Sequence, residues 1–378
     1  MPAGWSGCAY WRYRMPYYKL RKIGGKYDWL LAEGPDNKVS YQDVQWASQN
    51  CDIVHMQSPA GQDAINLIDV YHKEGRGVMI DYDDYSFDLS PTNPRYAQLG
   101  CKECEVLDEK GEVKYRWRDG ENGFDLAANN ASFGTFVKCV RMADLVTVTT
   151  DYLADKFKSV GAKTAVLPNS IDLDRWKPLP RPAEFMDQIR IGWFGGDSHG
   201  TDLKMFKTLL PRICKLSPKV KIVMQAPIVP QWQDFFKDVP RDQLEWHGWT
   251  DLRYYPFFLG ARHWDIGLAP LDNTTDGEFN KCKSSIKWME FAAVGAACVA
   301  QNMLPYSASI EDGKTGMLAD TEDEWVEKID SLVRNPTLLC TMKDNAMAEV
   351  RKNHNLDINC KAWELAAGSV LEKYGKGG

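Results

Sequence analysis

The sequence lacks any long apolar run, and this absence limits where the protein can work. No stretch of the 378 residues reaches the ~18 apolar residues that a membrane-spanning helix needs. The N-terminal stretch is polar and aromatic, without the apolar core of a cleavable signal peptide. The ten cysteines are scattered, and most lie within helix-like or strand-like runs, which suits reduced thiols. We therefore expect a soluble cytoplasmic protein.

The chain has one cysteine pair with CxxC spacing, and no second pair of metal-ligating residues lies at a suitable distance from it. Cys101 and Cys104 precede a predicted hairpin that turns at Lys110-Gly111. A zinc knuckle needs two such pairs at a suitable distance. A structural role is the simpler interpretation, although metal binding with partners distant in sequence stays open. We predict no metal site.

Acidic residues are absent from Met1 to Tyr27, although the whole chain has a formal net charge of −6. The net charge argues weakly against a general nucleic-acid binder. The acid-free stretch instead mixes cations with aromatic rings, among them Tyr10, Arg12 and Arg14. Such a mixture can grip phosphates and stack on bases or sugars. The alternative interpretation is an amphipathic first helix whose basic side chains reach along its surface into water.

Short apolar runs alternate with helix-like segments along most of the chain. This alternation is typical of parallel sheets covered by helices on both faces. The predicted strands of the first half are Trp29–Ala32, Asp52–Met56, Val78–Tyr82, Leu145–Thr149 and Thr164–Leu167. Those of the second half are Ile189–Phe194, Lys221–Gln225, Leu244–His247, Ile266–Leu268, Cys298–Gln301 and Gly316–Leu318.

A proline-rich segment, Pro168 to Pro182, divides the chain because it cannot continue a helix or a central strand. We predict a first domain over residues 1–170 and a second over 186–357, joined by a linker over 171–185. An irregular insertion at about 89–124 and a last helix over 358–378, able to cross back to the first domain, complete the prediction. Parallel sheets bind ligands beyond the carboxyl ends of their strands, so a ligand is expected between the two domains.

The stretch from Trp264 to Gln301 carries the clearest sign of an anionic ligand. An apolar strand, Asp265 to Leu271, leads into a polar loop and then into a helix-like segment rich in lysine. Gly295 ends that segment, and a second apolar strand follows. A strand, a loop and a helix with cations in its first turns suit a diphosphate group.

These segments, taken in order, resemble the GT-B glycosyltransferases, most closely the retaining, nucleotide-sugar enzymes of family 4. The end of that family's first domain is matched by ADLVTVTTDYLADKF and VLPNSIDLDRW. Its signature, Lys-x-x-Glu-[Tyr/Phe]-x-Ala-x-Gly-x-x-Val-Val-Ala, is matched by SSIKWMEFAAVGAACVAQ, and its approach to the C-terminus by YSASIEDGKTGMLADTEDEW. The resemblance covers most of Asp144 to Pro336. It implies an α/β protein of the GT-B fold, with two Rossmann-like, doubly wound domains facing a central cleft.

The resemblance assigns donor-binding residues by position. Lys287 should contact the donor diphosphate, and Glu290 should hydrogen-bond the ribose hydroxyls. The chemistry agrees, because a carboxylate accepts two hydroxyl protons and an ammonium neutralises a leaving diphosphate. Lys283 lies four residues before Lys287 on the same helix face and is the next phosphate candidate. The remaining predicted donor contacts are Gly195, Gly196, His199, Asn280 and Ser284.

Catalytic candidates come from a cluster of carboxylates and one histidine. Asp83 and Asp84 follow a strand at the place where the family often has an acidic pair near the acceptor. Either could orient an acceptor hydroxyl or take its proton, whereas helix capping or Mg²⁺ binding is the structural alternative. His55 could face the same ligand, with a buried, hydrogen-bonded histidine as the alternative. Glu278 is included because Cys282 replaces the first glutamate of the family's Glu-x₇-Glu pair.

The acceptor side is assigned to the basic and aromatic N-terminal stretch. Its predicted acceptor-binding residues are Gly7, Tyr10, Arg12 and Arg14. A small phage-like transferase with such residues could modify hydroxymethylated pyrimidines in DNA, provided that the base is flipped or single-stranded. A glycan, a lipid-linked sugar or a protein side chain is the competing acceptor.

We therefore predict a retaining, metal-independent hexosyl- or pentosyltransferase that needs no cofactor and uses a nucleotide-diphosphate sugar, with a UDP-sugar favoured. It would work in the cytoplasm, or in the host cytoplasm if phage-encoded. The family has no agreed protein nucleophile, so none is named. Two hypotheses from other classes stay open: a GT-B nucleotide-sugar epimerase, and a non-catalytic nucleic-acid-binding protein on the same scaffold.

Overall fold

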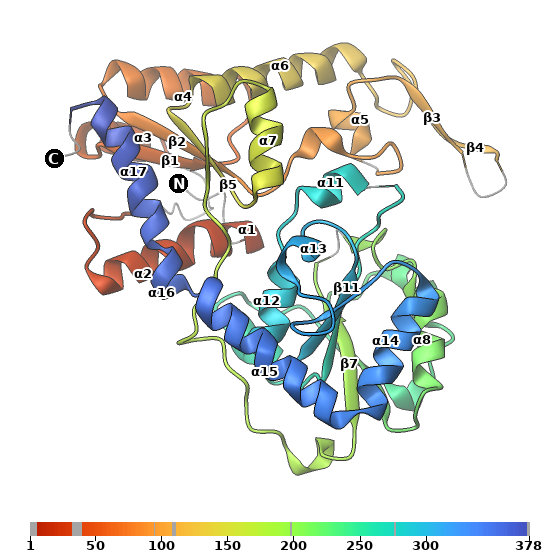
Figure 1. Ribbon diagram of the computed structural model, residues 1–378. Helices are drawn as coiled ribbons and strands as arrows, with labels where there is room; N and C mark the ends of the chain where they lie inside the picture. Colours follow the sequence, from red (N-terminus) through yellow and green to blue (C-terminus); the bar gives the residue numbers. More distant parts are fainter. Residues whose placement is uncertain are drawn as a thin grey trace. The chain divides into compact units, whose positions relative to one another are not determined.

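The computed structural model describes residues 6–31, 40–93, 95–107, 111–196, 199–275 and 277–375. The chain divides into two compact units (Figure 1). Unit 1 comprises Met1–Asn169, Asn273–Ser284 and Asp357–Gly378, and unit 2 comprises Ser170–Asp272 and Ser285–Leu356. Each unit contains a parallel sheet with helices packed on it. The α/β class predicted from the alternating pattern is confirmed.

The main sheet of unit 1 has four parallel strands in the order β1–β2–β5–β6. These strands are β1 (Ile53–Gln57), β2 (Gly77–Tyr82), β5 (Leu145–Val148) and β6 (Thr164–Val166). The surrounding helices are α3 (Tyr41–Asn50), α4 (Gly61–Lys73), α6 (Leu126–Met142), α7 (Asp151–Ser159), α16 (Leu356–Asn359) and α17 (Lys361–Lys373). Helices α4 and α6 pack together (Figure 1). The apolar faces of α4, α6 and α7 and the strands form one core that includes Ile68, Val78, Ile80 and Phe157.

The N-terminal stretch forms one helical segment in three parts. These are α1 (Gly7–Ala9), the π-helical turn η1 (Tyr10–Arg14) and α2 (Met15–Ile23), which ends at Gly24 in a left-handed conformation. The Ser6 hydroxyl caps the start by accepting the Ala9 amide at 3.1 Å. All five residues of η1 are buried, so Arg12 and Arg14 do not reach into water. On α2, Arg21 and Lys22 are exposed, as the amphipathic-helix interpretation expected.

The predicted strand at Trp29–Ala32 is wrong for residues 29–31, which are irregular, and Ala32 lies outside the described residues. The apolar character of this run has another cause. Trp29 is buried and packs its ring 4.8 Å from that of Tyr17 on α2. Side-chain packing on a helix therefore accounts for an apolar side chain that the pattern attributed to a sheet.

The insertion at about 89–124 has a small structure of its own. It contains α5 (Tyr96–Leu99) and an antiparallel hairpin, β3 (Cys104–Leu107) and β4 (Val113–Trp117), which extends from the rest of unit 1 (Figure 1). Tyr96, Val106, Trp117 and Phe124 form its apolar core. Of the predicted turn, Gly111 has a φ of +79°, and Lys110 is not among the described residues. Cys101 and Cys104 are free thiols, and the described part of the chain has no cluster of three ligands suited to a metal ion.

Unit 2 has six parallel strands in the order β12–β11–β10–β7–β8–β9. They are β7 (Ile189–Phe194), β8 (Val220–Gln225), β9 (Leu244–His247), β10 (Ile266–Ala269), β11 (Ala297–Gln301) and β12 (Met317–Ala319). The helices are α8 (Phe206–Cys214), α9 (Gln233–Phe236), α10 (Tyr255–Gly260), α12 (Ile286–Ala293), α13 (Tyr306–Ser309), α14 (Glu322–Arg334) and α15 (Pro336–Asn353). Helices α8 and α14 pack together, as do α12 and α15 on the other side of the sheet (Figure 1).

The observed units differ from the predicted domain ranges in two places. Residues 170–185 group with unit 2, and residues 273–284, which include α11 (Gly277–Lys281), group with unit 1. The second difference has a clear physical cause, because Cys282 is fully buried in the core of unit 1. The terminal residues 357–378 also group with unit 1. Within these terminal residues, the Tyr374 hydroxyl donates to Asp144 at 2.9 Å. Asp144 also accepts a hydrogen bond from the Val78 amide at 2.8 Å.

The helices also bear on the question of a membrane. Within the described ranges, every helix is too short or too polar to span a bilayer.

Candidate functional site

Unit 2 carries a buried lysine and a buried glutamate on one short helix. Lys287 and Glu290 lie three positions apart on α12 and are 7% and 2% exposed. The Lys287 ammonium donates to the Phe194 carbonyl oxygen at 2.9 Å, which holds it at the carboxyl end of β7. Its Nζ also lies 5.0 Å from the ring centroids of Trp193 and Phe194. The cation is therefore fixed in position rather than free in solvent.

One carboxylate oxygen of Glu290 could accept a hydrogen bond from a ligand. Among the described residues, no group hydrogen-bonds its Oε1 atom. Burial raises the pKa of Glu290 to about 8, against the opposing effects of the Lys287 charge and a hydrogen bond from Tyr255. A buried polar atom without a partner is uncommon in native proteins and calls for an explanation such as a bound ligand.

The turn after β7 brings backbone close to Lys287. A Cβ atom added to Gly195 would lie 3.1 Å from Lys287 Nζ and 2.5 Å from the Trp193 ring, so only glycine fits there. A Cβ at Gly196 would meet nothing within 4 Å. His199 follows, and its Nδ1 lies 2.7 Å from Asp202 Oδ2. The structure thus gathers Gly195 and Lys287 at one strand end, where an anion could meet a cation beside a glycine turn. The Gly195 amide itself donates to the Gln225 carbonyl oxygen at 3.2 Å.

The other predicted donor contacts belong to unit 1. Asn280 is buried there, and Ser284 accepts a hydrogen bond from the Asn169 side-chain amide at 2.9 Å. The Lys283 ammonium lies 5.4 Å from the Phe279 ring centroid, and its charge acts on Asp84. Their role in donor binding stays a prediction.

Glu278 is engaged by neighbours within unit 1. It accepts a hydrogen bond from the Tyr152 hydroxyl at 2.7 Å and forms ion pairs with Lys281 at 2.6 Å and Lys156 at 3.4 Å. These contacts, the Lys281 hydrogen bond first, lower the pKa of Glu278 to about 2. A carboxylate that stays ionised and carries three partners is a poor proton donor at neutral pH. The arrangement suits attachment of residues 273–284 to unit 1.

His55 lies in a buried hydrogen-bonded chain. Its Nδ1 is 2.6 Å from the Tyr17 hydroxyl, and its Nε2 is 3.2 Å from Thr147 Oγ1. Burial lowers the pKa of His55 well below its usual value, so the ring is neutral. Both ring nitrogens are occupied, which matches the buried, hydrogen-bonded alternative left open by the sequence. Thr147 continues the chain by donating to Asp81 Oδ1 at 2.6 Å.

Arg12 is the last member of this series of hydrogen-bonded side chains. Its guanidinium donates to both oxygens of Asp81, at 3.0 and 2.7 Å, and to Asn169 Oδ1 at 3.1 Å. Arg12, Arg14 and Tyr10 are each only 1% exposed. Of the four predicted acceptor-binding residues, Gly7 alone is exposed. The arginines and the tyrosine assigned to the acceptor are therefore buried, whereas Arg21 and Lys22 of the same stretch are exposed.

Asp83 and Asp84 follow β2 and are half-buried. Burial, followed by the negative charge of Asp84, raises the pKa of Asp83 to about 7, while a hydrogen bond from the Cys8 thiol opposes the rise. Burial also raises the pKa of Asp84. A carboxyl group that titrates near neutral pH can act as a general base, so this pair keeps its place as a catalytic candidate.

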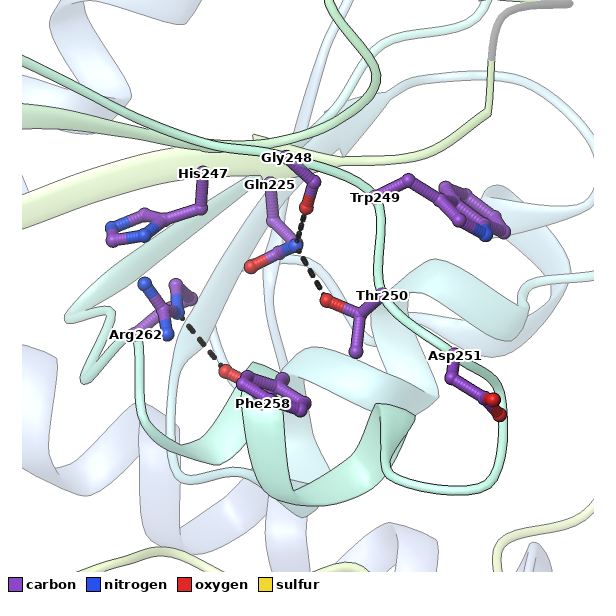
Figure 2. A pocket seen from close by; sticks show the side chains of 8 residues that line it. All are labelled: Gln225, His247, Gly248, Trp249, Thr250, Asp251, Phe258 and Arg262. Atoms are coloured by element: carbon purple, nitrogen blue, oxygen red, sulfur yellow. Dashed lines mark hydrogen bonds between the residues drawn. The ribbon is translucent and has the colours of Figure 1, made fainter.

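A cavity of about 430 Å³ opens at the carboxyl ends of β8 and β9 (Figure 2). Gln225 spans part of it by donating to the Gly248 carbonyl and to Thr250 Oγ1, the latter at 3.0 Å. The full lining is Gln225, His247, Gly248, Trp249, Thr250, Asp251, Phe258 and Arg262. None of these residues is among the predicted site residues. One sequence feature could have indicated this cavity. The predicted strand Leu244–His247 is followed directly by a glycine, and parallel sheets bind ligands where their strands end.

Comparisons with known proteins agree with this architecture. Residues 205–364 match the family described as glycosyl transferase-like. Among solved structures, a glycosyltransferase from Rickettsia africae superimposes with a TM-score of 0.64 at 13% identity, covering 98% of this chain and 97% of that one. HepE from Anabaena in complex with UDP gives 0.59 at 15% identity, covering 87% and 81%. Sucrose-phosphate synthase from Thermosynechococcus elongatus gives 0.57 at 14% identity, covering 91% and 83%.

The curated proteins yield no sequence match. At these identities the structural similarity establishes the fold. The chain therefore has the GT-B fold of glycosyltransferases, and its part from residue 205 to 364 matches the glycosyl transferase-like family.

Proposed function

We propose that this protein is a glycosyltransferase that binds a nucleotide-diphosphate sugar, with a UDP-sugar as the favoured donor, through unit 2. The observation that carries the proposal is the pair formed by Lys287 and Glu290. A buried carboxylate with an open oxygen suits ribose hydroxyls, and a fixed ammonium beside a glycine turn suits a diphosphate. HepE, which shares the fold, has been crystallised with UDP and with UDP-glucose, which supports this choice of donor.

The sheet of unit 2 provides an order for the donor's parts. Strands β7, β8 and β9 are neighbours, and Lys287 is held at the carboxyl end of β7. The cavity of Figure 2 opens at the ends of β8 and β9. We therefore place the diphosphate at β7 and the nucleoside base in the cavity, where Trp249 and Phe258 offer apolar surface and Gln225 and Arg262 offer polar groups.

The finer features of the reaction belong to the same proposal. Transfer would proceed with retention and without a metal, with Lys287 neutralising the leaving diphosphate. Asp83 would orient the acceptor hydroxyl. A hydroxymethylated pyrimidine in phage DNA was considered as acceptor because Arg12, Arg14 and Arg21 were expected to contact phosphates. Arg12 and Arg14 are buried, and only Arg21 of these three is exposed, so a carbohydrate acceptor is favoured.

The proposal is tested by a panel of nucleotides and sugar nucleotides. UDP and at least one UDP-sugar are expected to raise the melting temperature, with about 2.7 kcal/mol of stabilisation at a concentration 100 times Kd. Mass spectrometry of donor and acceptor mixtures then identifies the product. If no nucleotide shifts the melting temperature, the proposal fails. An altered sugar without transfer would favour an epimerase, and salt-sensitive DNA binding without donor hydrolysis would favour a nucleic-acid-binding protein.

The affinity for UDP-glucose is expected to depend on pH through Glu290. Because burial raises the pKa of Glu290 to about 8, the free protein holds a proton there at pH 6 to 7. Accepting two ribose hydroxyls requires the ionised form, so binding releases a proton and Kd should rise up to about tenfold for each unit that the pH falls from 8 to 6. Calorimetry in two buffers of different ionisation enthalpy measures the released proton.

Glu290→Gln serves as the control for this pH dependence, because an amide does not titrate. Its affinity for UDP-glucose should be weaker and nearly constant over the same range. The same slope in the wild type and in Glu290→Gln would assign the proton to another group.

A further inference from the structure

A second cavity, of about 220 Å³, lies wholly within unit 1. It is formed by the loop after β1, the end of β2, the insertion and helix α6. Of the residues singled out in the sequence, it includes Asp84 alone. Its other polar lining residues are Ser58, Ser86, Arg95 and Ser132.

The cavity lies where a parallel sheet normally binds its ligand. Ser58 comes directly after β1, and Tyr82 ends β2, so both strands point their carboxyl ends at it. The loop is held in place, because the Tyr82 hydroxyl donates to the Pro59 carbonyl at 2.8 Å. Ser58 has a backbone φ of +41°, a value that residues other than glycine rarely adopt. Such strain costs about 1–3 kcal/mol and is concentrated at functional sites.

The walls of the cavity combine aromatic surface with polar groups. Phe87 and Phe136 pack with ring centroids 4.8 Å apart and, with Tyr82, form the apolar part of the lining. On the polar side, Asp84 accepts a hydrogen bond from the Ser86 hydroxyl at 3.0 Å. The positive charge of Arg95 acts on the same carboxylate.

This combination matches a sugar ring. The C–H face of a sugar packs on aromatic surface, while its hydroxyls donate to carboxylates and accept from guanidinium and hydroxyl groups. The volume is below the roughly 300–1,000 Å³ of pockets for drug-sized ligands, so a single ring is the appropriate size.

We propose that this cavity binds the sugar ring of the acceptor, so that the acceptor is a carbohydrate whose reacting ring contacts Asp84, Arg95 and the aromatic wall. The inference rests on the proposed function, because it names the second substrate of the same reaction. Asp84 accepts hydrogen bonds from ring hydroxyls and Arg95 donates hydrogen bonds to them, and Asp83 follows β2 immediately before Asp84. The predicted roles of Tyr10, Arg12 and Arg14 are not needed for this site.

Two tryptophan variants on α6 test the site. Ser132 is exposed at the rim of the cavity, and Ser132→Trp fills a space of this size. Ala131 is the exposed neighbour that does not line the cavity, so Ala131→Trp adds the same side chain elsewhere. Both positions are exposed, so both variants should fold, which circular dichroism and the melting temperature verify.

Three measurements are made on wild type and on both variants. Calorimetry gives the Kd of UDP-glucose, saturation-transfer NMR without donor gives the binding of glucose, galactose and N-acetylglucosamine, and mass spectrometry gives transfer rates. We expect Ser132→Trp to lose sugar binding and about 100-fold or more of kcat/KM for the sugar acceptor, with the Kd of UDP-glucose unchanged. Ala131→Trp should match the wild type. Arg95→Met should raise the acceptor KM more than it lowers kcat.

The outcomes separate this inference from the proposed function. Sugar binding or transfer that survives in Ser132→Trp overturns the site, as does wild-type protein that binds no sugar. Transfer to hydroxymethylcytosine DNA instead of a sugar overturns the acceptor class. Failure of wild type to bind UDP-glucose or any other sugar nucleotide overturns the proposed function, and the NMR measurement still decides whether the cavity holds a sugar.

Discussion

Lys287→Ala is expected to lower kcat by about 100- to 1,000-fold, the loss typical of removing one group that stabilises charge in the transition state. Its Nζ is fixed at the end of β7, close to where a side chain on Gly195 would begin. Negative charge grows on the departing diphosphate, so the ammonium should act mainly on kcat.

Glu290→Ala removes ribose contacts instead and should raise the donor KM by about 10- to 100-fold, since hydrogen bonds to charged groups contribute about 1.5–3 kcal/mol. Steady-state kinetics with the donor found in the panel separates the two effects.

Lys207→Ala is the matched control for this experiment. Lys207 is also a lysine of unit 2, but it is 46% exposed and pairs with Asp234 at 2.8 Å. Its removal should leave kcat and KM unchanged. A fully active, folded Lys287→Ala enzyme would show that the diphosphate binds elsewhere, and a matching loss in Lys207→Ala would point to a general effect of charge.

Arg12→Met is expected to destabilise unit 1 by about 3–5 kcal/mol, because it leaves the buried Asp81 carboxylate without its counter-charge. Both side chains of this pair are 1% exposed, and the guanidinium also holds Asn169. A loss of this size is a large part of the usual 5–15 kcal/mol of folding stability. Hydrogen-exchange mass spectrometry on peptides from β2 and β6 reports on unit 1 directly, which matters because two units need not unfold together.

Lys158→Met provides the comparison with a surface pair. Lys158 lies 2.9 Å from Asp155, and the two side chains are 58% and 75% exposed. Solvent screens such pairs, so the expected cost is below about 1 kcal/mol. Adding Asp81→Asn to Arg12→Met should recover part of the lost stability, because no uncompensated charge then remains. An Arg12→Met protein as stable as Lys158→Met would show that the buried pair contributes little and would reopen a binding role for Arg12.

The strands could be predicted because burial in a parallel sheet demands apolar side chains along the whole strand. Ile189–Phe194 has the same bounds in the sequence prediction and in the structure, and so does Leu244–His247, although this edge strand is only half-buried. The spacing of Lys287 and Glu290 on one helix is equally local, because three positions bring two side chains near one face. Trp29 marks the limit of such patterns, because an apolar run does not say whether its neighbour is a strand or the ring of Tyr17.

By itself, the sequence determined the α/β alternation and the placement of Lys287 and Glu290 three positions apart on one helix, because both depend on residues close together along the chain. The tertiary structure decided which charges are available to a ligand. Arg12 meets Asp81 across 69 positions, and Glu278 meets Tyr152 across 126. A basic residue has the same local pattern whether it faces water or a distant carboxylate, so only the folded chain shows that Arg12 is buried. The two cavities likewise arise where separate loops meet at strand ends, which no local spacing records.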